Sequence, residues 1–232
     1  LIIIETMNDS YETKAALLAV KESTSLPVIV STVYDENGKL MTGASPEVMI
    51  SIIEGMGADA LGINCSLGPR EMLSVCSDIV RLSSIPVIVS PNAGLPKSVN
   101  GVTVYDITAD EFSDVMVEIA ELGVNILGGC CGTTPEKTVE KTKNIASVSM
   151  QDKDISIVSS YSKAVIFGDI PILIGERINP TGKKKVKEAL RSNNLDFIIN
   201  EGIMQEELGV HILDVNVGLP EINECEMMVK TV

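Results

Sequence analysis

The first 146 residues alternate between two kinds of hydrophobic pattern. Short apolar runs that are rich in β-branched residues and bounded by turn residues predict buried strands. Longer stretches with apolar residues three and four positions apart predict helices. The predicted strands are Leu1–Glu5, Pro27–Tyr34, Ala60–Cys65, Pro86–Asn92 and Val124–Cys130. The predicted helices are Tyr11–Ser23, Ser45–Gly57, Arg70–Ser84, Thr108–Gly123 and Thr134–Ala146.

Consecutive strand–helix units with right-handed crossovers predict a parallel sheet, either open and doubly wound or closed as a (β/α)8 barrel. The residues that carry chemistry fall at the carboxyl ends of the predicted strands, where barrel enzymes assemble their sites. These residues are Glu5, Cys65, Asn92, Cys130 and Cys131. The pattern therefore favours the later units of a partial (β/α)8 TIM barrel, with about three further units expected before Leu1.

A second series of strand–helix units follows a break in the pattern. Residues 148–163 are rich in Ser, Asp and Lys without a sustained period, which predicts a linker. The next predicted strands are Ala164–Phe167, Ile170–Gly175 and His211–Asn216, and the predicted helices are Lys183–Ser192, Leu195–Gly209 and Glu221–Val232. We expect three parts: a first domain over 1–147, a linker over 148–163, and the first βα units of a second TIM barrel over 164–232.

Composition narrows the functional classes. The chain has 232 residues, 45% of them hydrophobic and only 3% aromatic, so its core is aliphatic, as is common in parallel α/β proteins. A net charge of −14 disfavours nucleic acid as a partner. No apolar run approaches the roughly 20 residues of a membrane helix. Five unevenly spaced cysteines do not resemble a secreted disulfide framework, and we expect a cytoplasmic protein.

Three cysteines form the main candidate site. Cys65 ends one predicted strand, and Cys130 and Cys131 end another strand of the same predicted sheet. Three thiolates suit zinc, and three protein ligands leave one tetrahedral position open for a substrate. A vicinal redox pair and plain structural cysteines are the alternatives that the spacing leaves open. Cys76 lies among apolar helical positions and is expected in the core, and Cys225 is expected to be an ordinary helix residue.

The motifs GINC and GGCCGT, which contain these cysteines, resemble the homocysteine-binding domain of the homocysteine methyltransferases, a zinc-dependent barrel family. The resemblance implies that Cys65, Cys130 and Cys131 bind zinc and that the homocysteine thiol takes the fourth position. Coordination to zinc deprotonates a thiol at neutral pH, which makes it a nucleophile. The resemblance also implies homocysteine contacts at Glu5 and Asn92; an exposed Glu and a turn-shaping Asn are the alternatives.

Two later motifs indicate the methyl donor. IGERINPTG (Ile174–Gly182) and HILDVNVGLPE (His211–Glu221) resemble the start of the pterin-binding domain of the cobalamin-dependent methionine synthase family. The resemblance implies that 5-methyltetrahydrofolate is bound by four residues: Glu176, Asn179, Asp214 and Asn216. For Asp214 and Asn216, a capped strand end is the alternative. His211, the only histidine, is expected to be structural rather than a metal ligand.

The order of the two resemblances implies a reaction. Methyl transfer would run from 5-methyltetrahydrofolate through cobalamin to zinc-bound homocysteine and form methionine. The cobalamin-binding module would lie outside this sequence, in the same chain or in a separate subunit. We expect the isolated chain to be inactive, because open barrel edges expose apolar strands. The alternatives are a folate-independent homocysteine S-methyltransferase that uses betaine or methylmethionine, and a non-catalytic zinc- or thiol-binding fragment.

Overall fold

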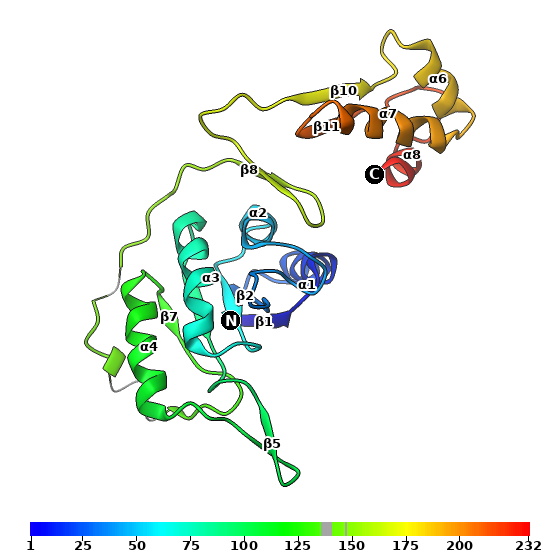
Figure 1. Ribbon diagram of the computed structural model, residues 1–232. Helices are drawn as coiled ribbons and strands as arrows, with labels where there is room; N and C mark the ends of the chain where they lie inside the picture. The colour runs from blue at the N-terminus through cyan, green and yellow to red at the C-terminus, as the bar shows by residue number, and fades with distance from the viewer. Residues whose placement is uncertain (136–140, 147) are drawn as a thin grey trace. The chain divides into compact units, whose positions relative to one another are not determined.

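The computed structural model describes residues 1–135, 141–146 and 148–232. These residues form two compact units, Leu1–Ile166 and Phe167–Val232 (Figure 1). Among the described helices, none combines the length and the apolar character that crossing a bilayer requires.

The first unit is built on a five-stranded sheet in which every pair of neighbours is parallel. Its strands, in spatial order, are β1 (Ile2–Met7), β2 (Val28–Thr32), β3 (Ala60–Asn64), β4 (Val87–Ser90) and β7 (Ile126–Leu127). Each strand pairs with the next main strand along the chain, so all five carboxyl ends lie at one edge. All residues of β2 and β3 are buried, because both faces of these central strands are covered. The predicted parallel α/β class is confirmed.

Four helices connect these strands: α1 (Ser10–Ser23), α2 (Pro46–Gly55), α3 (Pro69–Leu82) and α4 (Ala109–Glu121). Consecutive helices contact each other, and their apolar sides form one core with the sheet (Figure 1). Pro46 and Pro69 are the first residues of their helices. The backbone N–H of a residue at this position has no partner within the helix, so the lack of an N–H in proline does not weaken the helix. The helix predicted over Thr134–Ala146 includes residues 136–140, which lie outside the described residues, so it stays a prediction.

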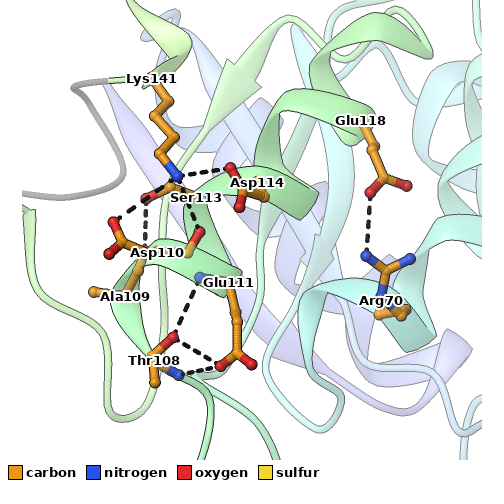
Figure 2. Close-up of polar contacts among 9 residues, drawn as sticks. All are labelled: Arg70, Thr108, Ala109, Asp110, Glu111, Ser113, Asp114, Glu118 and Lys141. Carbon is orange, nitrogen blue, oxygen red and sulfur yellow. Dashed lines mark hydrogen bonds and ion pairs between the residues drawn. The ribbon is translucent and has the colours of Figure 1, made fainter.

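The start of α4 is fixed by a capping box. The Thr108 hydroxyl accepts a hydrogen bond from the N–H of Glu111, and the Glu111 carboxylate accepts one from the N–H of Thr108 (Figure 2). Lys141 Nζ lies 2.6 Å from a carboxylate oxygen of Asp114 on the same helix, and Arg70 joins α3 to Glu118 at 3.1 Å (Figure 2). These ion pairs are solvent-exposed, so they contribute little to stability and mainly orient the helix.

A hairpin inside the β4–α4 connection was not predicted. Its strands are β5 (Lys97–Val99) and β6 (Val102–Val104), which pair antiparallel (Figure 1). Asn100 and Gly101 at the turn both have positive φ, 52° and 80°. Two consecutive residues of this kind form the tight turn that an Asn-Gly pair favours, so the sequence did contain the signal.

A second hairpin spans the end of the predicted linker and the first residues of the predicted second domain. Strand β8 (Ile157–Ser159) pairs antiparallel with β9 (Ala164–Ile166), and both contact α2. The Tyr161 hydroxyl at the turn donates a 2.6 Å hydrogen bond to Asp9, and Ser10 donates one to the Tyr161 carbonyl. Residues 164–166, predicted to open the second domain, therefore belong to the first unit, which ends at Ile166. These contacts join residues that are some 150 positions apart in the sequence. Local hydrophobic patterns therefore could not predict them.

The second unit contains two parallel strands, β10 (Ile174–Ile178) and β11 (Ile212–Val215). The helices α6 (Lys184–Arg191) and α7 (Leu195–Glu207) connect them, and α8 (Glu224–Thr231) follows. Strand β10 begins later than the predicted Ile170, whose side chain is exposed. A small core joins the elements: Ile178, Val186, Ala189, Leu190, Ile198, Val217, Leu219 and Met227.

The close approach of β3 and β4 predicts a large cost for any side chain at Gly62. An added Cβ at Gly62 would lie 1.7 Å from the carbonyl oxygen of Ile88, which is backbone and cannot rotate away. We expect Gly62→Ala to lower the free energy of unfolding by about 3 kcal/mol or more in urea titrations. Gly55→Ala is the matched control, because nothing lies within 4 Å of its Cβ position and its φ is ordinary. That variant should be neutral or up to about 1 kcal/mol more stable; equal stabilities for the two variants would contradict the prediction.

Candidate metal centre

Three thiols meet at the carboxyl edge of the sheet. Cys65 directly follows β3, and Cys130 and Cys131 follow β7. The Sγ atoms of Cys65 and Cys131 are 4.0 Å apart, those of Cys130 and Cys131 are 3.9 Å apart, and all three lie within 4.8 Å of one another. The structure thus brings together the three cysteines singled out from the sequence, and their role as metal ligands stays a prediction.

The spacing of the sulfur atoms suits one tetrahedral metal ion. Zinc–sulfur bonds of about 2.3 Å at tetrahedral angles would separate two sulfurs by about 3.8 Å. The separations of 3.9 and 4.0 Å are close to this value and far longer than a disulfide bond of about 2.05 Å. Cys65 and Cys130 are half-buried and Cys131 is exposed, so a small molecule has access to the cluster from solvent.

The backbone at Cys65 adopts a conformation that few side chains accept. Cys65 and Ser66 have φ values of 61° and 65°, in the left-handed region where non-glycine residues are uncommon. Hydrogen bonds hold the turn: the N–H of Cys65 donates to Ser90 on β4, and the N–H of Leu67 donates back to Cys65 at 2.8 Å. Conformations of this kind persist where surrounding contacts enforce them, and they concentrate at functional sites.

The Cys130–Cys131 segment is docked on the loop that follows β4. The N–H of Cys130 donates to the Pro91 carbonyl at 2.7 Å, and the N–H of Ala93 donates to the Cys131 carbonyl at 2.9 Å. Gly129 makes the turn possible, because a Cβ there would lie 2.3 Å from the Thr133 hydroxyl oxygen. Backbone contacts therefore fix both thiols against a neighbouring strand end.

Asn92, predicted to contact homocysteine, supports this docking. Its side chain is buried with 4% exposure, and its carboxamide oxygen accepts a 3.0 Å hydrogen bond from the N–H of Cys131. The same side chain interacts with the Cys65 thiol. Asn92 thus lies at the cysteine cluster as expected, but its described contacts are to the protein, and its contact with substrate stays a prediction.

Glu5, the other predicted homocysteine contact, lies exposed near the end of β1. The next residue, Thr6, has a φ of 62° and donates its N–H to the carboxamide oxygen of Asn64 at 2.9 Å. Asn64 was missed by sequence reasoning. It is buried, accepts a hydrogen bond from Ser31 at 2.7 Å and donates one to the Thr6 hydroxyl at 2.7 Å. It therefore ties the ends of three strands together beside Cys65; its only signal was a polar residue at the end of an apolar strand.

The thiols of Cys65 and Cys130 do not ionise alike in the metal-free protein. Partial burial raises the pKa of Cys65, but hydrogen bonds from the Ser66 N–H and from the thiols of Cys130 and Cys131 outweigh burial and lower it. Burial and the negative charge of Cys65 raise the pKa of Cys130 to about 11. Cys65 therefore ionises before Cys130. A bound divalent cation would favour the thiolate form of all three.

In the second unit, Glu176 and Asn179 contact each other at the carboxyl end of β10. Asn179 donates a 2.6 Å hydrogen bond to one carboxylate oxygen of Glu176, and Lys183 Nζ lies 2.7 Å from the other. Lys183 accordingly lowers the pKa of Glu176.

Asp214 and Asn216 lie on and just after β11, the parallel neighbour of β10, so all four predicted folate contacts come from adjacent strand ends. The carboxamide oxygen of Asn216 accepts a hydrogen bond from the Gly218 N–H at 2.8 Å. His211 accepts one from the N–H of Leu173 through Nδ1, in keeping with a structural role.

Comparison with known proteins adds independent evidence. The family model described as homocysteine S-methyltransferase matches residues 1–145. The chain is 32% identical over 224 residues to a protein named methionine synthase from Mycobacterium tuberculosis (strain ATCC 25618 / H37Rv). It is 31% identical over 229 residues to methionine synthase from Mycobacterium leprae (strain TN). Each alignment covers 92% of this chain but only 19% of the relative, so the chain spans about a fifth of their length.

A solved structure supports the fold. The metallated form of the homocysteine methyltransferase MmuM from Escherichia coli matches 62% of this chain and 45% of that protein, with a TM-score of 0.50 and 22% sequence identity. At this identity the likeness concerns the fold alone, and it agrees with the parallel α/β architecture of the first unit.

The unequal ionisation of the thiols predicts unequal reactivity in metal-free protein. Cys65 and Cys130 are both half-buried, so they form a matched pair. At pH 8, iodoacetamide should modify Cys65 at least about tenfold faster than Cys130, because the thiolate is the reacting form. The difference should shrink as the pH rises through about 11, where Cys130 ionises. Peptide mass spectrometry measures both rates, and Cys76, buried with a pKa raised to about 12, should stay unmodified as a control for folding. Equal rates at pH 8 would refute the prediction.

Proposed function

This chain belongs to the homocysteine S-methyltransferase family, and on that premise we propose that it forms part of an enzyme that methylates the sulfur of homocysteine at a zinc site. The observation that carries the proposal is the convergence of three free thiols at the carboxyl edge of a parallel sheet. Methionine synthases that align with 92% of the chain support the same activity.

Cys65, Cys130 and Cys131 are the residues that would hold zinc, since their sulfurs are spaced for one tetrahedral ion. Zinc bound there would supply a Lewis acid that keeps the substrate thiol ionised at neutral pH. Three protein ligands leave one position for the sulfur of homocysteine, and the exposure of Cys131 leaves it accessible. In the transfer, a new S–CH3 bond forms while the bond between the methyl group and its carrier breaks, and the electron pair leaves with the carrier.

Two further residues complete the proposed homocysteine site. Glu5 offers an exposed carboxylate near the end of β1, and a carboxylate suits the ammonium group of an amino acid. Asn92 holds the Cys131 backbone in place through its carboxamide oxygen, so it orients a ligand of the metal. These two residues would position the substrate and the metal, while the thiolates carry the chemistry.

We propose 5-methyltetrahydrofolate as the methyl donor and cobalamin, held by a module outside this chain, as the carrier. The support is that alignments with methionine synthases cover 92% of the chain and so extend into the second unit, beyond residue 145. Glu176, Asn179, Asp214 and Asn216 would bind the donor from two adjacent strand ends. Carboxylate and amide oxygens accept the N–H groups that the edge of a pterin presents.

The proposed architecture is a pair of partial (β/α)8 barrels. For the first unit, the support is a parallel sheet whose five strands pair in chain order, as barrel strands do. For the second, it is a parallel β10–β11 pair joined by helices. We place the connection between them after Ile166, rather than at residue 163, because the β8–β9 hairpin packs on α2.

The zinc site is tested by replacing Cys65, Cys130 and Cys131 singly with Ser in the full-length protein that contains this chain. Each variant should lose most of its bound zinc and its homocysteine methylation, because a hydroxyl is a poor ligand for this metal. Zinc content by mass spectrometry and methionine formation are the measurements. Cys225→Ser is the control, because this exposed cysteine lies in the other unit. Zinc loading that survives all three replacements would refute the proposal.

The folate site is tested by Asp214→Asn. We expect the Kd for 5-methyltetrahydrofolate to rise roughly 10- to 100-fold, since a hydrogen bond to a charged acceptor is lost. Methylation of homocysteine by added methylcobalamin should be unchanged, because that step uses the first unit. Asp169→Asn, an exposed carboxylate of the same unit, is the matched control. Absence of folate binding in the unmodified protein would favour a betaine or methylmethionine donor instead.

A further inference from the structure

The strand that carries Glu5 is irregular near its carboxyl end. Pairing of β1 with β2 keeps one register up to Ile4 and shifts before Met7. Glu5 and Thr6 lie within this shift, and both are exposed, although neighbouring residues of a regular strand face opposite sides. Thr6 has a φ of 62°, which a β-branched residue rarely adopts. Irregularities of this kind re-aim side chains and are common beside active sites.

The side chain of Asn64 holds this irregular segment. Its carboxamide oxygen accepts a hydrogen bond from the N–H of Thr6 at 2.9 Å, and its nitrogen donates to the Thr6 hydroxyl at 2.7 Å. A backbone N–H can only donate, so the oxygen of the carboxamide must face it. The N–H of Thr6 belongs to the peptide group that follows Glu5. These two bonds therefore fix the backbone that carries the Glu5 side chain.

Burial makes the Asn64 side chain a firm support. Its exposed fraction is 3%, and its carboxamide oxygen accepts a second bond from the hydroxyl of Ser31, at 2.7 Å, on the intervening strand β2. Ser31 is itself buried. A buried polar group that loses its partner destabilises the protein, so the three bonds together favour one arrangement of the strand ends.

Asn64 directly precedes Cys65, so one side chain connects the backbone of Glu5 with the strand end that carries a predicted zinc ligand. Cys65 has further anchors of its own. Its N–H donates to the Ser90 carbonyl at 3.1 Å, and its carbonyl accepts from the N–H of Leu67 at 2.8 Å. Loss of the Asn64 side chain should therefore release Glu5 while Cys65 stays in place.

The proposed substrate makes the separation of these two groups important. Homocysteine carries its thiol and its ammonium group on one short chain. Both can bind at the same time only if the metal and the carboxylate that receives the ammonium group keep a matching separation. A separation that the protein fixes before binding spares the cost of ordering the site.

We propose that Asn64 is a specificity-determining positioning residue, which sets Glu5 relative to Cys65 and so makes the site select thiols with an amino group at the distance found in homocysteine. The inference rests on the proposed homocysteine site, with zinc at the three cysteines and the ammonium group at Glu5. Asn64 acts through Glu5 and takes no part in the chemistry.

Asn64→Ala tests the proposal in the zinc-loaded full-length protein. Isothermal titration calorimetry gives the Kd for L-homocysteine and for 4-mercaptobutanoate, which is homocysteine without its amino group. The Kd for homocysteine should rise roughly tenfold, and that for 4-mercaptobutanoate less than about twofold, because only the contact with the charged ammonium group is lost. The amount of bound zinc should be unchanged.

Asn125→Ala is the matched control. The carboxamide of Asn125 also joins separate parts of the backbone, at 3.0 Å from the Val87 N–H and 3.3 Å from the Val148 carbonyl. It precedes β7, at the opposite end of that strand from the cysteines. This variant should leave the ratio of the two Kd values unchanged.

Thr6→Ala is a second variant that keeps the buried carboxamide. Thr6 is exposed, so the fold should be retained, and only the bond between the Asn64 nitrogen and the hydroxyl is lost. The Kd for homocysteine should rise roughly threefold, as expected for one neutral hydrogen bond, with that for 4-mercaptobutanoate unchanged. This variant decides the question if Asn64→Ala does not fold.

A double-mutant cycle with Glu5→Gln separates positioning from a general loss of structure. If Asn64 acts through Glu5, Asn64→Ala should change the Kd for homocysteine by less than about twofold once Glu5 is replaced. The same loss with and without Glu5, or an equal loss for both thiols, would overturn the role of Asn64 alone. Unmodified protein that binds neither thiol would overturn the proposed function itself.

Discussion

The site depends on the hydrogen bonds that dock Cys130 and Cys131 on the loop after β4. Thiolates repel one another, so ionised cysteine side chains alone would not hold three sulfur atoms within 4.8 Å. The backbone supplies the constraint. Cys130 and Cys131 donate to Pro91 and Asn92, and Cys131 accepts from Ala93, so each thiol is fixed by the strand that lies between β7 and β3. Each such bond contributes about 1 kcal/mol net, but together they define one geometry.

The fold of the first unit was largely predictable because its signals are local. Apolar runs marked the strands that became β2 and β3, and the expected helices begin and end within two residues of α1 to α4. The convergence of Cys65 with Cys130 and Cys131 followed from topology alone, since parallel strands bring their carboxyl ends to one edge. The β5–β6 hairpin was not predicted, although the Asn100–Gly101 pair indicates a tight turn. Its strands are only three residues long, which is too short to show an alternating hydrophobic pattern.

Other features of the structure could not be predicted from the sequence, because they depend on contacts between residues that are distant along the chain. Asn64 joins three strand ends through Thr6 and Ser31, and a lone polar residue in an apolar run carries no sign of such partners. The β8–β9 hairpin has the composition of a linker, and its contacts are with α2 and Asp9, which are distant in sequence.

Both units place their candidate site residues at the carboxyl ends of parallel strands, but the side chains at these ends differ in chemistry. In both, parallel strands lie side by side, and residues in or just after their carboxyl-terminal parts form the candidate site. In the first unit these residues are thiols, soft donors that suit zinc and exclude hard cations. In the second they are carboxylates and amides, and Glu176 is held by Lys183 and Asn179. Lys183 also donates to the backbone carbonyl of Glu176 at 2.6 Å, and the Glu176 carboxylate itself is exposed to solvent. The first site is therefore set by backbone contacts, whereas the second is set by contacts between polar side chains. This contrast is what the proposed function would require, because the proposed zinc ion would stay bound and the proposed methyl donor would leave after each turnover.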